Sequence, residues 1–197
     1  MRISALKEIA GRSSGAPLII YANHSSWWDG LVAFEISRKC KLSSFIMMEE
    51  RQLKKLFLFR KLGAFSVVKE IPREAVESIN YAAQILKKDF RRALWIFPQG
   101  EILPNDLRPV RFFNGISRII EKTGNVQVLP VAVKYEFLEN FKPEIFIKVG
   151  KLEMLEIGKN FQPKKYTELL AIKLERVLDE LKNEIAYGKF DEFEKII

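Results

Sequence analysis

The stretch Leu18-Ile-Ile-Tyr-Ala-Asn-His24-Ser-Ser-Trp-Trp-Asp29 runs from a strongly apolar segment into the only histidine of the chain. Its β-branched and aromatic residues predict a buried strand over Pro17 to Ala22, and the pattern after it predicts a helix over Trp28 to Lys39. Residues five apart on a continuous helix do not share a face, so His24 and Asp29 meet only if the chain turns between strand and helix. The stretch therefore predicts a strand, a turn that carries His24, and a helix.

The same alternation continues along the chain. Short apolar runs predict further strands at Ser43 to Met48, Ala64 to Val68, Ala93 to Phe97, Val126 to Val133 and Ile145 to Val149. Helical periodicity predicts helices over Arg73 to Phe90, over Gly115 to Lys122, and from near Thr167, as the N-cap, to a residue before Gly188. With 197 residues and 48% hydrophobic content, we expect one α/β domain, residues 1–197, with a mixed, mostly parallel β-sheet flanked by helices.

Composition argues against several classes of protein. No window approaches 18 uninterrupted apolar residues, and residues 1 to 15 lack the apolar core of a signal peptide, so neither a membrane span nor export is expected. One cysteine, Cys40, and one histidine cannot form an internal disulfide or a Cys/His zinc site, so no metal site is expected and a reducing cytoplasm fits. The net charge of +8 favours an anionic partner, although the same excess can simply keep a protein soluble.

His24 is the residue best suited to proton transfer. Its side chain takes and returns a proton near neutral pH, and a nearby carboxylate such as Asp29 fixes its tautomer and stabilises its charged form. A second unusual segment, Leu94-Trp-Ile-Phe-Pro-Gln-Gly-Glu101, is an apolar strand that stops at Pro-x-Gly. Such a turn either presents backbone amides to a ligand or is a plain strand-to-loop turn. A third segment, Leu62 to Lys69, is a glycine-led strand that ends in a cation.

These segments, in this order, resemble the motifs of the glycerolipid acyltransferase superfamily, which includes glycerol-3-phosphate and 1-acylglycerol-3-phosphate acyltransferases. Asparagine-histidine-x4-aspartate is matched by Asn23, His24 and Asp29, and the glycine-led basic strand is similar to Gly63 to Lys69. Phenylalanine-proline-glutamate-glycine is matched by Phe97, Pro98 and Gly100, followed by an aromatic-x-glycine element at Phe112 to Gly115. The short strand with proline is similar to Val128 to Ala132. The resemblance covers residues 17 to 135 and implies an acyltransferase-like fold.

The chain departs from the family pattern in the third motif. Gln99 replaces the usual glutamate, and Glu101 and Ile102 stand where the family commonly has threonine or glycine and then arginine. Members that accept a phosphorylated substrate use that arginine at the acceptor. The resemblance therefore leaves two acceptors open, a lysophospholipid-like molecule and a neutral hydroxyl lipid.

The resemblance implies transfer of a fatty acyl group from acyl-CoA or acyl carrier protein, as co-substrate without a further cofactor, to a hydroxyl of a lipid acceptor. His24 would be the general base and Asp29 would orient its ring, with no acyl-enzyme. Amides around Gly100 are the expected donors to the thioester oxygen. The expected substrate-binding residues are Lys69, Arg73, Phe97, Pro98, Gln99, Gly100, Glu101, Arg108 and Arg111. For Lys69 and Arg111 the alternative is an ordinary surface salt bridge.

Two segments raise the question of a membrane surface. Arg51 to Lys61 mixes five cations with a dense apolar cluster, which favours insertion at an anionic lipid interface over a helix docked on the core with its lysines outward. Trp27 and Trp28 either line the acceptor site or pack in the core, and at least one is expected to pack. We therefore expect a cytoplasmic protein that associates peripherally with an anionic membrane.

Two other functions are weaker alternatives. No G-x-S-x-G elbow supports a serine hydrolase, and Ser25 and Ser26 are expected to cap the following helix. A non-catalytic basic protein that binds lipid or nucleic acid is compatible with the charge, but no nucleic-acid signature occurs, and we expect no nucleic-acid partner.

Overall fold

The computed structural model of the chain describes residues 1–10, 15–55, 58–68, 71–139 and 141–196. Its strands are β1 (Arg2–Ser4), β2 (Leu18–Ala22), β3 (Ser43–Glu49), β4 (Ala64–Val67), β5 (Arg92–Ile96), β6 (Val126–Glu136), β7 (Glu144–Val149), β8 (Glu153–Leu155) and β9 (Glu194–Lys195). Its helices are α1 (Leu6–Ala10), α2 (Asp29–Lys39), α3 (Glu50–Lys55), α4 (Leu58–Lys61), α5 (Pro72–Lys88), α6 (Gly115–Thr123) and α7 (Pro163–Ala186).

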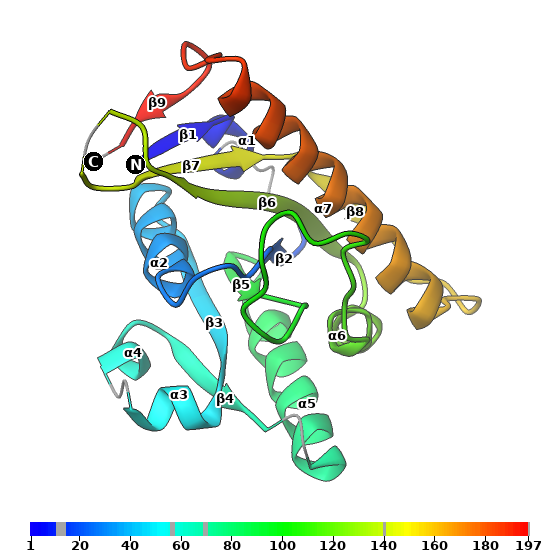
Figure 1. The fold of residues 1–197 in the computed structure, drawn as a ribbon. Coiled ribbons are helices and arrows are strands. Elements are labelled where there is room, and N and C mark those ends of the chain that lie inside the picture. The colour runs from blue at the N-terminus through cyan, green and yellow to red at the C-terminus, as the bar shows by residue number, and fades with distance from the viewer. Residues whose placement is uncertain (11–14, 56–57, 69–70, 140, 197) are drawn as a thin grey trace.

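The strands form one sheet in the order β4-β3-β5-β2-β6-β7-β1-β9, and β8 pairs with the start of β6 (Figure 1). The neighbours from β4 to β6 are all parallel, as are β1 and β7. The pairs β6–β7, β6–β8 and β1–β9 are antiparallel. The α/β class with a mixed, mostly parallel sheet flanked by helices is therefore confirmed.

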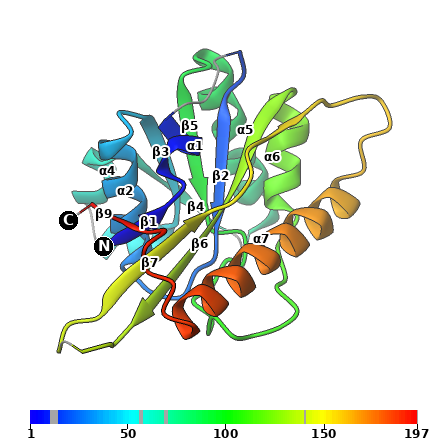
Figure 2. The same ribbon diagram turned by 90° about the horizontal axis from the view of Figure 1, so that it is seen from above.

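Strand β2 lies in the middle of the sheet and is buried on both faces. Ile19 and Tyr21 pack into a core shared with α5, α6 and α7, whereas Leu18, Ile20 and Ala22 pack into a core shared with α1 and α2. Figure 2 shows these two groups of helices on opposite sides of the sheet. Burial on both faces explains why this strand is a continuous apolar run, since a strand with one solvated face alternates instead.

Some predicted boundaries are corrected by the structure. Helix α7 begins at Pro163, not at Thr167. Proline suits the first helical position because its missing N–H has no partner there, and Gln162 before it is extended. Thr167 lies inside the helix, buried, with its hydroxyl 2.8 Å from Ser117 Oγ and 2.9 Å from the Pro163 carbonyl oxygen. Strand β6 also continues beyond the expected end at Val133, to Glu136.

The elements that sequence patterns missed are short. Strands β1, β8 and β9 span three, three and two residues, too few to show a period. They exist because a neighbouring strand offers a pairing edge: β1 lies along β7, β8 along β6, and β9 along β1. Such strands are fixed by tertiary pairing and not by local propensity.

The segment Arg51 to Lys61 forms α3 and α4, although residues 56 and 57 lie outside the described part. Leu53 and Phe59 are buried, with 2% and 7% exposure, in the core that contains α2. The cations Arg51, Lys54 and Lys55 are exposed. For these residues the segment is docked on the core with its charges outward. Among the described helices, none is long and apolar enough to cross a bilayer.

Candidate active site

The polar residues after β2 lie at the carboxyl edge of the parallel strands, where ligands bind in open α/β sheets. Strand β2 is flanked by β5 and β6, with Tyr21 opposite both Ile96 and Pro130. Three parts of the chain therefore meet at this edge: the turn after β2, the loop after β5, and the last residues of β6. Each contributes a residue to the network described below.

The backbone of His24 is held by the loop after β5. Its N–H donates to Gln99 Oε1 at 2.8 Å, and its carbonyl accepts the Leu103 N–H at 2.8 Å. The imidazole lies against the Phe97 ring, with 4.9 Å between ring centroids and 30° between planes. These contacts from one loop fix both the backbone and the ring face of His24.

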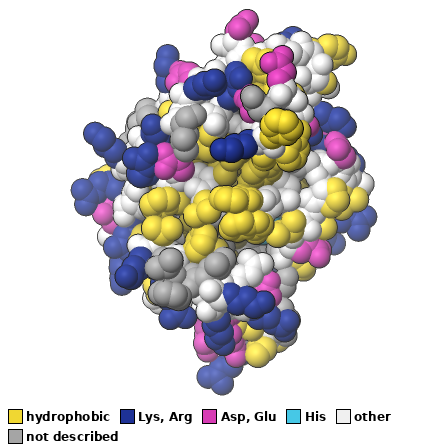
Figure 3. All heavy atoms as spheres, turned by 60° about the vertical axis from the view of Figure 1, so that its left-hand side comes forward, with side chains coloured by type: hydrophobic (Ala, Val, Ile, Leu, Met, Phe, Trp, Pro, Cys, Tyr) yellow, Lys and Arg dark blue, Asp and Glu magenta, His cyan; other side chains and the backbone are white. Residues whose placement is uncertain are grey.

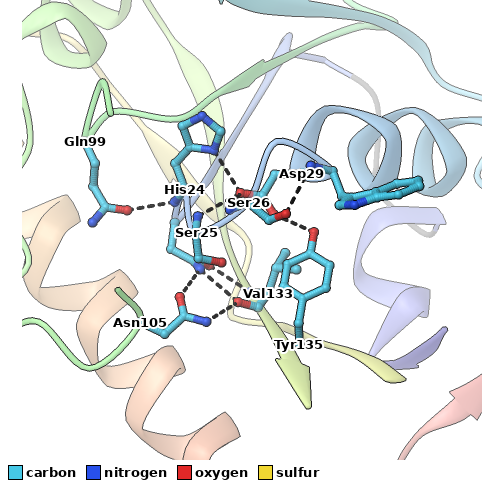
Figure 4. Close-up of polar contacts among 10 residues, drawn as sticks. His24, Ser25, Ser26, Asp29, Gln99, Asn105, Val133 and Tyr135 are labelled. Carbon is cyan, nitrogen blue, oxygen red and sulfur yellow. Dashed lines mark hydrogen bonds and ion pairs between the residues drawn. The ribbon is translucent and has the colours of Figure 1, made fainter. Parts of the chain in front are cut away.

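His24 and Asp29 meet as the predicted turn requires. His24 Nδ1 lies 2.8 Å from Asp29 Oδ2, while the side chains of His24 and Asp29 are 15% and 0% exposed. A carboxylate accepts, so Nδ1 carries the hydrogen and Nε2 keeps its lone pair. Figure 4 shows Nε2 on the side of the ring away from Asp29. The arrangement can accept a proton at Nε2 and stabilise the resulting charge.

The Asp29 carboxylate accepts four hydrogen bonds (Figure 4). Besides His24, the Ser25 and Ser26 backbone N–H groups donate to Oδ2 at 2.8 and 2.9 Å. The Tyr135 hydroxyl donates to Oδ1 at 2.6 Å. Burial, and then the Asp29 carboxylate, raise the pKa of Tyr135 well above its ordinary value, so the phenol stays a donor. Buried charge is tolerated here because each oxygen has a donor.

Asn23, the first residue of the histidine motif, joins the turn to β6. It is 2% exposed, and its Oδ1 accepts the Val133 N–H at 2.8 Å while its Nδ2 donates to the Val133 carbonyl at 2.8 Å. Nδ2 also donates to Asn105 Oδ1 at 2.7 Å, and Asn105 Nδ2 donates to the Val133 carbonyl at 3.1 Å. The Asn23 amide therefore fixes the position of the backbone at His24 relative to β6 and to the loop after β5.

Pro98 and Gly100 build the turn after β5. Gly100 has φ +72°, and an added Cβ would lie 2.8 Å from the Phe113 ring. The Pro98 carbonyl accepts the Phe113 N–H at 2.8 Å, so the loop folds back over the glycine. The Gly100 N–H donates to the Phe97 carbonyl at 3.0 Å, which closes the turn. This amide, expected to face the thioester oxygen, is thus used within the turn itself.

The loop after β5 also lines a hollow of about 510 Å³. It includes the predicted residues Gln99, Glu101, Arg108 and Arg111. Apolar lining comes from Leu103, Leu107, Pro109, Val110, Phe112 and Phe113. Gln99 and Leu103, which line the hollow, bond to the His24 backbone, so the hollow adjoins the histidine turn, although His24 itself does not line it. A mainly apolar hollow with a few charged groups suits an amphiphilic ligand.

The two arginines of the hollow differ in their partners. Arg108 donates to Asp179 on α7 at 2.5 Å and to the Asn105 carbonyl at 2.7 Å. Arg111 is exposed, and within the described residues it forms no ion pair. Arg108 therefore braces the loop against α7, whereas Arg111 is available to an anionic ligand.

Of the other two predicted cations, Arg73 is not part of this arrangement. Arg73 lies on the first turn of α5, is 89% exposed, and pairs with Glu77 at 3.2 Å. It lines a separate hollow of about 440 Å³ with Glu50 and Glu74, which shares no lining residue with the hollow beside His24. Lys69 lies outside the described residues.

The predictions for the tryptophans and serines of the turn also need correction. Trp27 and Trp28 are 54% and 48% exposed, and their rings contact each other with centroids 4.2 Å apart and planes tilted by 34°. The expectation that at least one packs in the core is therefore wrong. Neither serine caps α2 as expected: the N-cap is Trp28, without a side-chain cap bond, and Ser26 Oγ accepts the Trp28 N–H at 3.2 Å in the turn before the helix. The Ser25 hydroxyl has no partner among the described residues. Ser25 contributes its backbone N–H instead.

Tyr135 and Asn105 are the site residues that sequence reasoning missed. Both act through neighbours that are distant in the chain, since Tyr135 is 106 residues from Asp29 and Asn105 is 82 from Asn23. The pairing of β2 with β6 is the signal that would have found Tyr135. Once Ala22 lies opposite Val131, the residues just beyond Val133 must flank the histidine turn.

No group of three or more histidine, cysteine, aspartate or glutamate side chains that could hold a metal ion occurs within the part of the chain that the structure describes. Comparison with known families gives one finding: a family model described as Acyltransferase matches residues 5–134, well over half of the chain. No curated protein and no solved structure matches the chain.

Proposed function

Because the chain belongs to the glycerolipid acyltransferase family, we propose that it transfers a fatty acyl group from acyl-CoA or acyl carrier protein to a hydroxyl of a lipid acceptor. The observation that carries the proposal is the contact of His24 Nδ1 with the buried Asp29 Oδ2 at 2.8 Å. This pair leaves Nε2 as an acceptor at the edge of the sheet where ligands bind. It is the arrangement that a general base requires.

In the proposed reaction, His24 Nε2 takes the proton of the acceptor hydroxyl as its oxygen attacks the thioester carbonyl carbon. The carbon–sulfur bond breaks as the tetrahedral intermediate collapses, and the imidazolium returns its proton to the leaving thiolate. Asp29 stabilises the imidazolium in between. The products are an ester and a free thiol. No residue of the protein becomes acylated, because the acceptor oxygen is itself the nucleophile.

For the acceptor, we propose a lipid that carries a phosphate, bound in the hollow beside His24. Arg111 is the exposed cation of its lining, and the apolar lining suits the rest of a lipid. Ile102, where the family commonly has an arginine, is exposed and contributes no charge. Arg111 thus supplies from later in the loop a cation that this position lacks. The neutral hydroxyl lipid is the outcome expected if Arg111 proves irrelevant.

We also propose that the protein docks on an anionic membrane through the face that carries Trp27, Trp28 and the cations of α3 and α4. Phe59 of α4 packs on α2 where an added Gly30 Cβ would be 3.3 Å from its ring, so α4 adjoins the helix that follows the tryptophans. Figure 3 shows a hydrophobic band across this side of the molecule with lysine and arginine above and below it. Tryptophan with flanking cations favours a lipid–water interface.

The test of catalysis measures free thiol released from acyl-CoA with lysophospholipids and with neutral hydroxyl lipids. Since His24 is the only histidine, His24→Ala removes every imidazole from the chain. We expect acceptor-dependent release by the wild-type protein and its loss in His24→Ala, with unchanged circular dichroism. Turnover that survives the substitution would remove His24 as the base. No turnover with any acceptor would favour a lipid-binding protein without catalysis.

The test of docking is sedimentation with vesicles that contain anionic phospholipid. Charge reversal at Lys54, Lys55 and Lys61 is expected to reduce binding. Reversal at Lys87, Lys88 and Lys122 changes the net charge equally but lies on α5 and α6, and it should leave binding nearly unchanged. Equal loss in both variants would indicate a general charge effect and not a docking face.

A further inference from the structure

The Asp29 carboxylate has one hydrogen-bond partner that comes from outside its own turn. His24, Ser25 and Ser26, which all bond Oδ2, lie within five residues of Asp29. The Tyr135 hydroxyl, on β6, bonds Oδ1 at 2.6 Å across 106 residues. The carboxylate therefore has one oxygen held by the local turn and one held by the sheet.

Tyr135 lies one residue beyond the part of the chain that the family model matches. It belongs to the last residues of β6, where β7 is the antiparallel neighbour and Tyr135 faces Ile145 in register. The ring is partly buried, and its hydroxyl reaches Asp29 in the view of Figure 4. Burial and the adjacent carboxylate raise the pKa of Tyr135, so the hydroxyl keeps its proton over the working range of pH.

We propose that Tyr135 is a positioning residue that acts through Asp29 and sets the pH range in which His24 accepts a proton. By holding Oδ1, it fixes the rotation of the carboxylate so that Oδ2 stays with the His24 Nδ1–H and the two backbone donors. By donating to the carboxylate, it also takes part of the negative charge that would otherwise stabilise the imidazolium. This inference rests on the proposed role of His24 as the base.

The sign of the pH effect follows from the charge. Without the Tyr135 hydroxyl, the carboxylate offers more negative charge to the ring, so the imidazolium is favoured and the ring gives up its proton only at higher pH. Since neutral His24 is the active form, the acidic limb of kcat/KM must move to higher pH. A substitution that only destabilised the fold would lower activity without moving the acidic limb to higher pH.

Other charged groups on the surrounding elements do not change with Tyr135. On β6, Lys134 pairs with Glu136; on α2, Arg38 pairs with Glu35 at 2.5 Å; and on the loop after β5, Glu101 is exposed. On β7, Lys148 pairs with Glu184 of α7 and Glu144 with Arg2 of β1. These groups are the same in every variant below, so a shifted pH profile belongs to the tyrosine hydroxyl.

The experiment compares Tyr135→Phe with Tyr21→Phe. Tyr21 is a matched control because its hydroxyl is also buried, on the strand that leads to His24, but has no hydrogen-bond partner among the described residues. For Tyr135→Phe we expect kcat to fall about tenfold or more with KM nearly unchanged, as removal of a bond to a charged group does. Its acidic limb should move up by about half a pH unit or more. Tyr21→Phe should change neither.

A second measurement needs no turnover. Because the chain has one histidine, NMR signals of its ring followed against pH report on His24 alone. They should move with the activity profile in Tyr135→Phe. In an Asp29→Asn background, Tyr135→Phe should have little further effect on rate, because a residue that acts through Asp29 has nothing left to act on. Should Tyr135→Phe not fold, a low-field hydroxyl proton of Tyr135 in the wild-type protein, shifted by Asp29→Asn, tests the same bond.

The outcomes separate this inference from the proposed function. Activity that survives His24→Ala contradicts the function itself. Activity lost in His24→Ala but a wild-type pH profile in Tyr135→Phe, or a profile moved to lower pH, overturns only the role of Tyr135. An equal rate loss with and without Asp29→Asn also overturns it, since the tyrosine would then act independently of the carboxylate.

Discussion

Two adjoining regions of the site are built in opposite ways: the histidine turn (residues 23–29) and the cavity loop (residues 99–113). In the histidine turn, Asn23 and Asp29 are 2% and 1% exposed and every polar atom that positions His24 has a partner. In the cavity loop, Leu107 and Phe113 are 50% and 59% exposed, and Arg111 is exposed and forms no ion pair in the described chain. The proposed proton transfer would thus take place within a fixed frame of residues, and the proposed recognition of the acceptor on an open surface.

The departures from the family pattern follow the same division. The histidine turn matches the motif at Asn23, His24 and Asp29, whereas Gln99, Glu101 and Ile102 all belong to the cavity loop. Gln99 shows why one departure is tolerated: its Oε1 accepts the His24 N–H, which an amide oxygen does as well as a carboxylate oxygen. The exposed residues of the loop that form no bond to the histidine turn, such as Ile102 and Arg111, can change, and the ligand with them, without moving the histidine.

The largest effect is expected from Asp29→Asn in the histidine turn. The amide keeps the shape but removes the charge and offers an N–H where Oδ2 now accepts three donors. We expect kcat to fall about 10³- to 10⁴-fold, as for the equivalent change in a hydrolase triad, with KM changed far less. Steady-state kinetics on protein of unchanged circular dichroism checks this. A loss of less than tenfold would mean that the fixed frame is not what makes His24 a base.

The contrast also explains what sequence could and could not predict. The strand before His24, the turn and the helix after it were predictable because burial on both faces and a helical period leave a local pattern. The partners of the turn were not, because Tyr135 reaches it through the pairing of β2 with β6 and Asn105 through the fold of the loop after β5. The exposure of Trp27 and Trp28 was missed for a related reason. A hydrophobic side chain is buried only when other elements of the fold pack over it, and the local sequence does not show whether they do.

Gly100→Ala tests how firmly the cavity loop is tied to the turn. The substitution meets two obstacles, a φ of +72° and the Phe113 ring at 2.8 Å. Gly124→Ala meets only the first, since Gly124 has φ +91° and open space. We expect Gly124→Ala to lower the free energy of unfolding by about 1 kcal/mol and Gly100→Ala by about 1–3 kcal/mol. If urea denaturation gave the same loss of unfolding free energy for both variants, the contact with Phe113 would add nothing to the cost of the substitution.

Arg111→Ala tests recognition in the cavity loop without touching the histidine turn. For a phosphorylated acceptor, we expect KM to rise about tenfold with kcat nearly unchanged, because an exposed cation contributes to ground-state binding. Arg73→Ala, in the separate hollow, is the matched control and should leave both constants unchanged. If neither substitution matters and a neutral hydroxyl lipid is the better acceptor, the acceptor carries no phosphate.

The smallest effect is expected from Trp27 and Trp28. They belong to the otherwise buried histidine turn but are exposed, unlike Asn23 and Asp29. If they are the part of the fixed frame that meets lipid, Trp27→Ala with Trp28→Ala should weaken binding to anionic vesicles several-fold, about 1 kcal/mol, and leave turnover of a soluble short-chain acceptor unchanged. Tyr187→Ala, at an even more exposed aromatic residue just after α7, is the control and should bind as the wild type does. Reduced turnover with the soluble acceptor but unchanged vesicle binding would place the tryptophans at the acceptor instead, and the histidine turn would then contribute to recognition as well as to proton transfer.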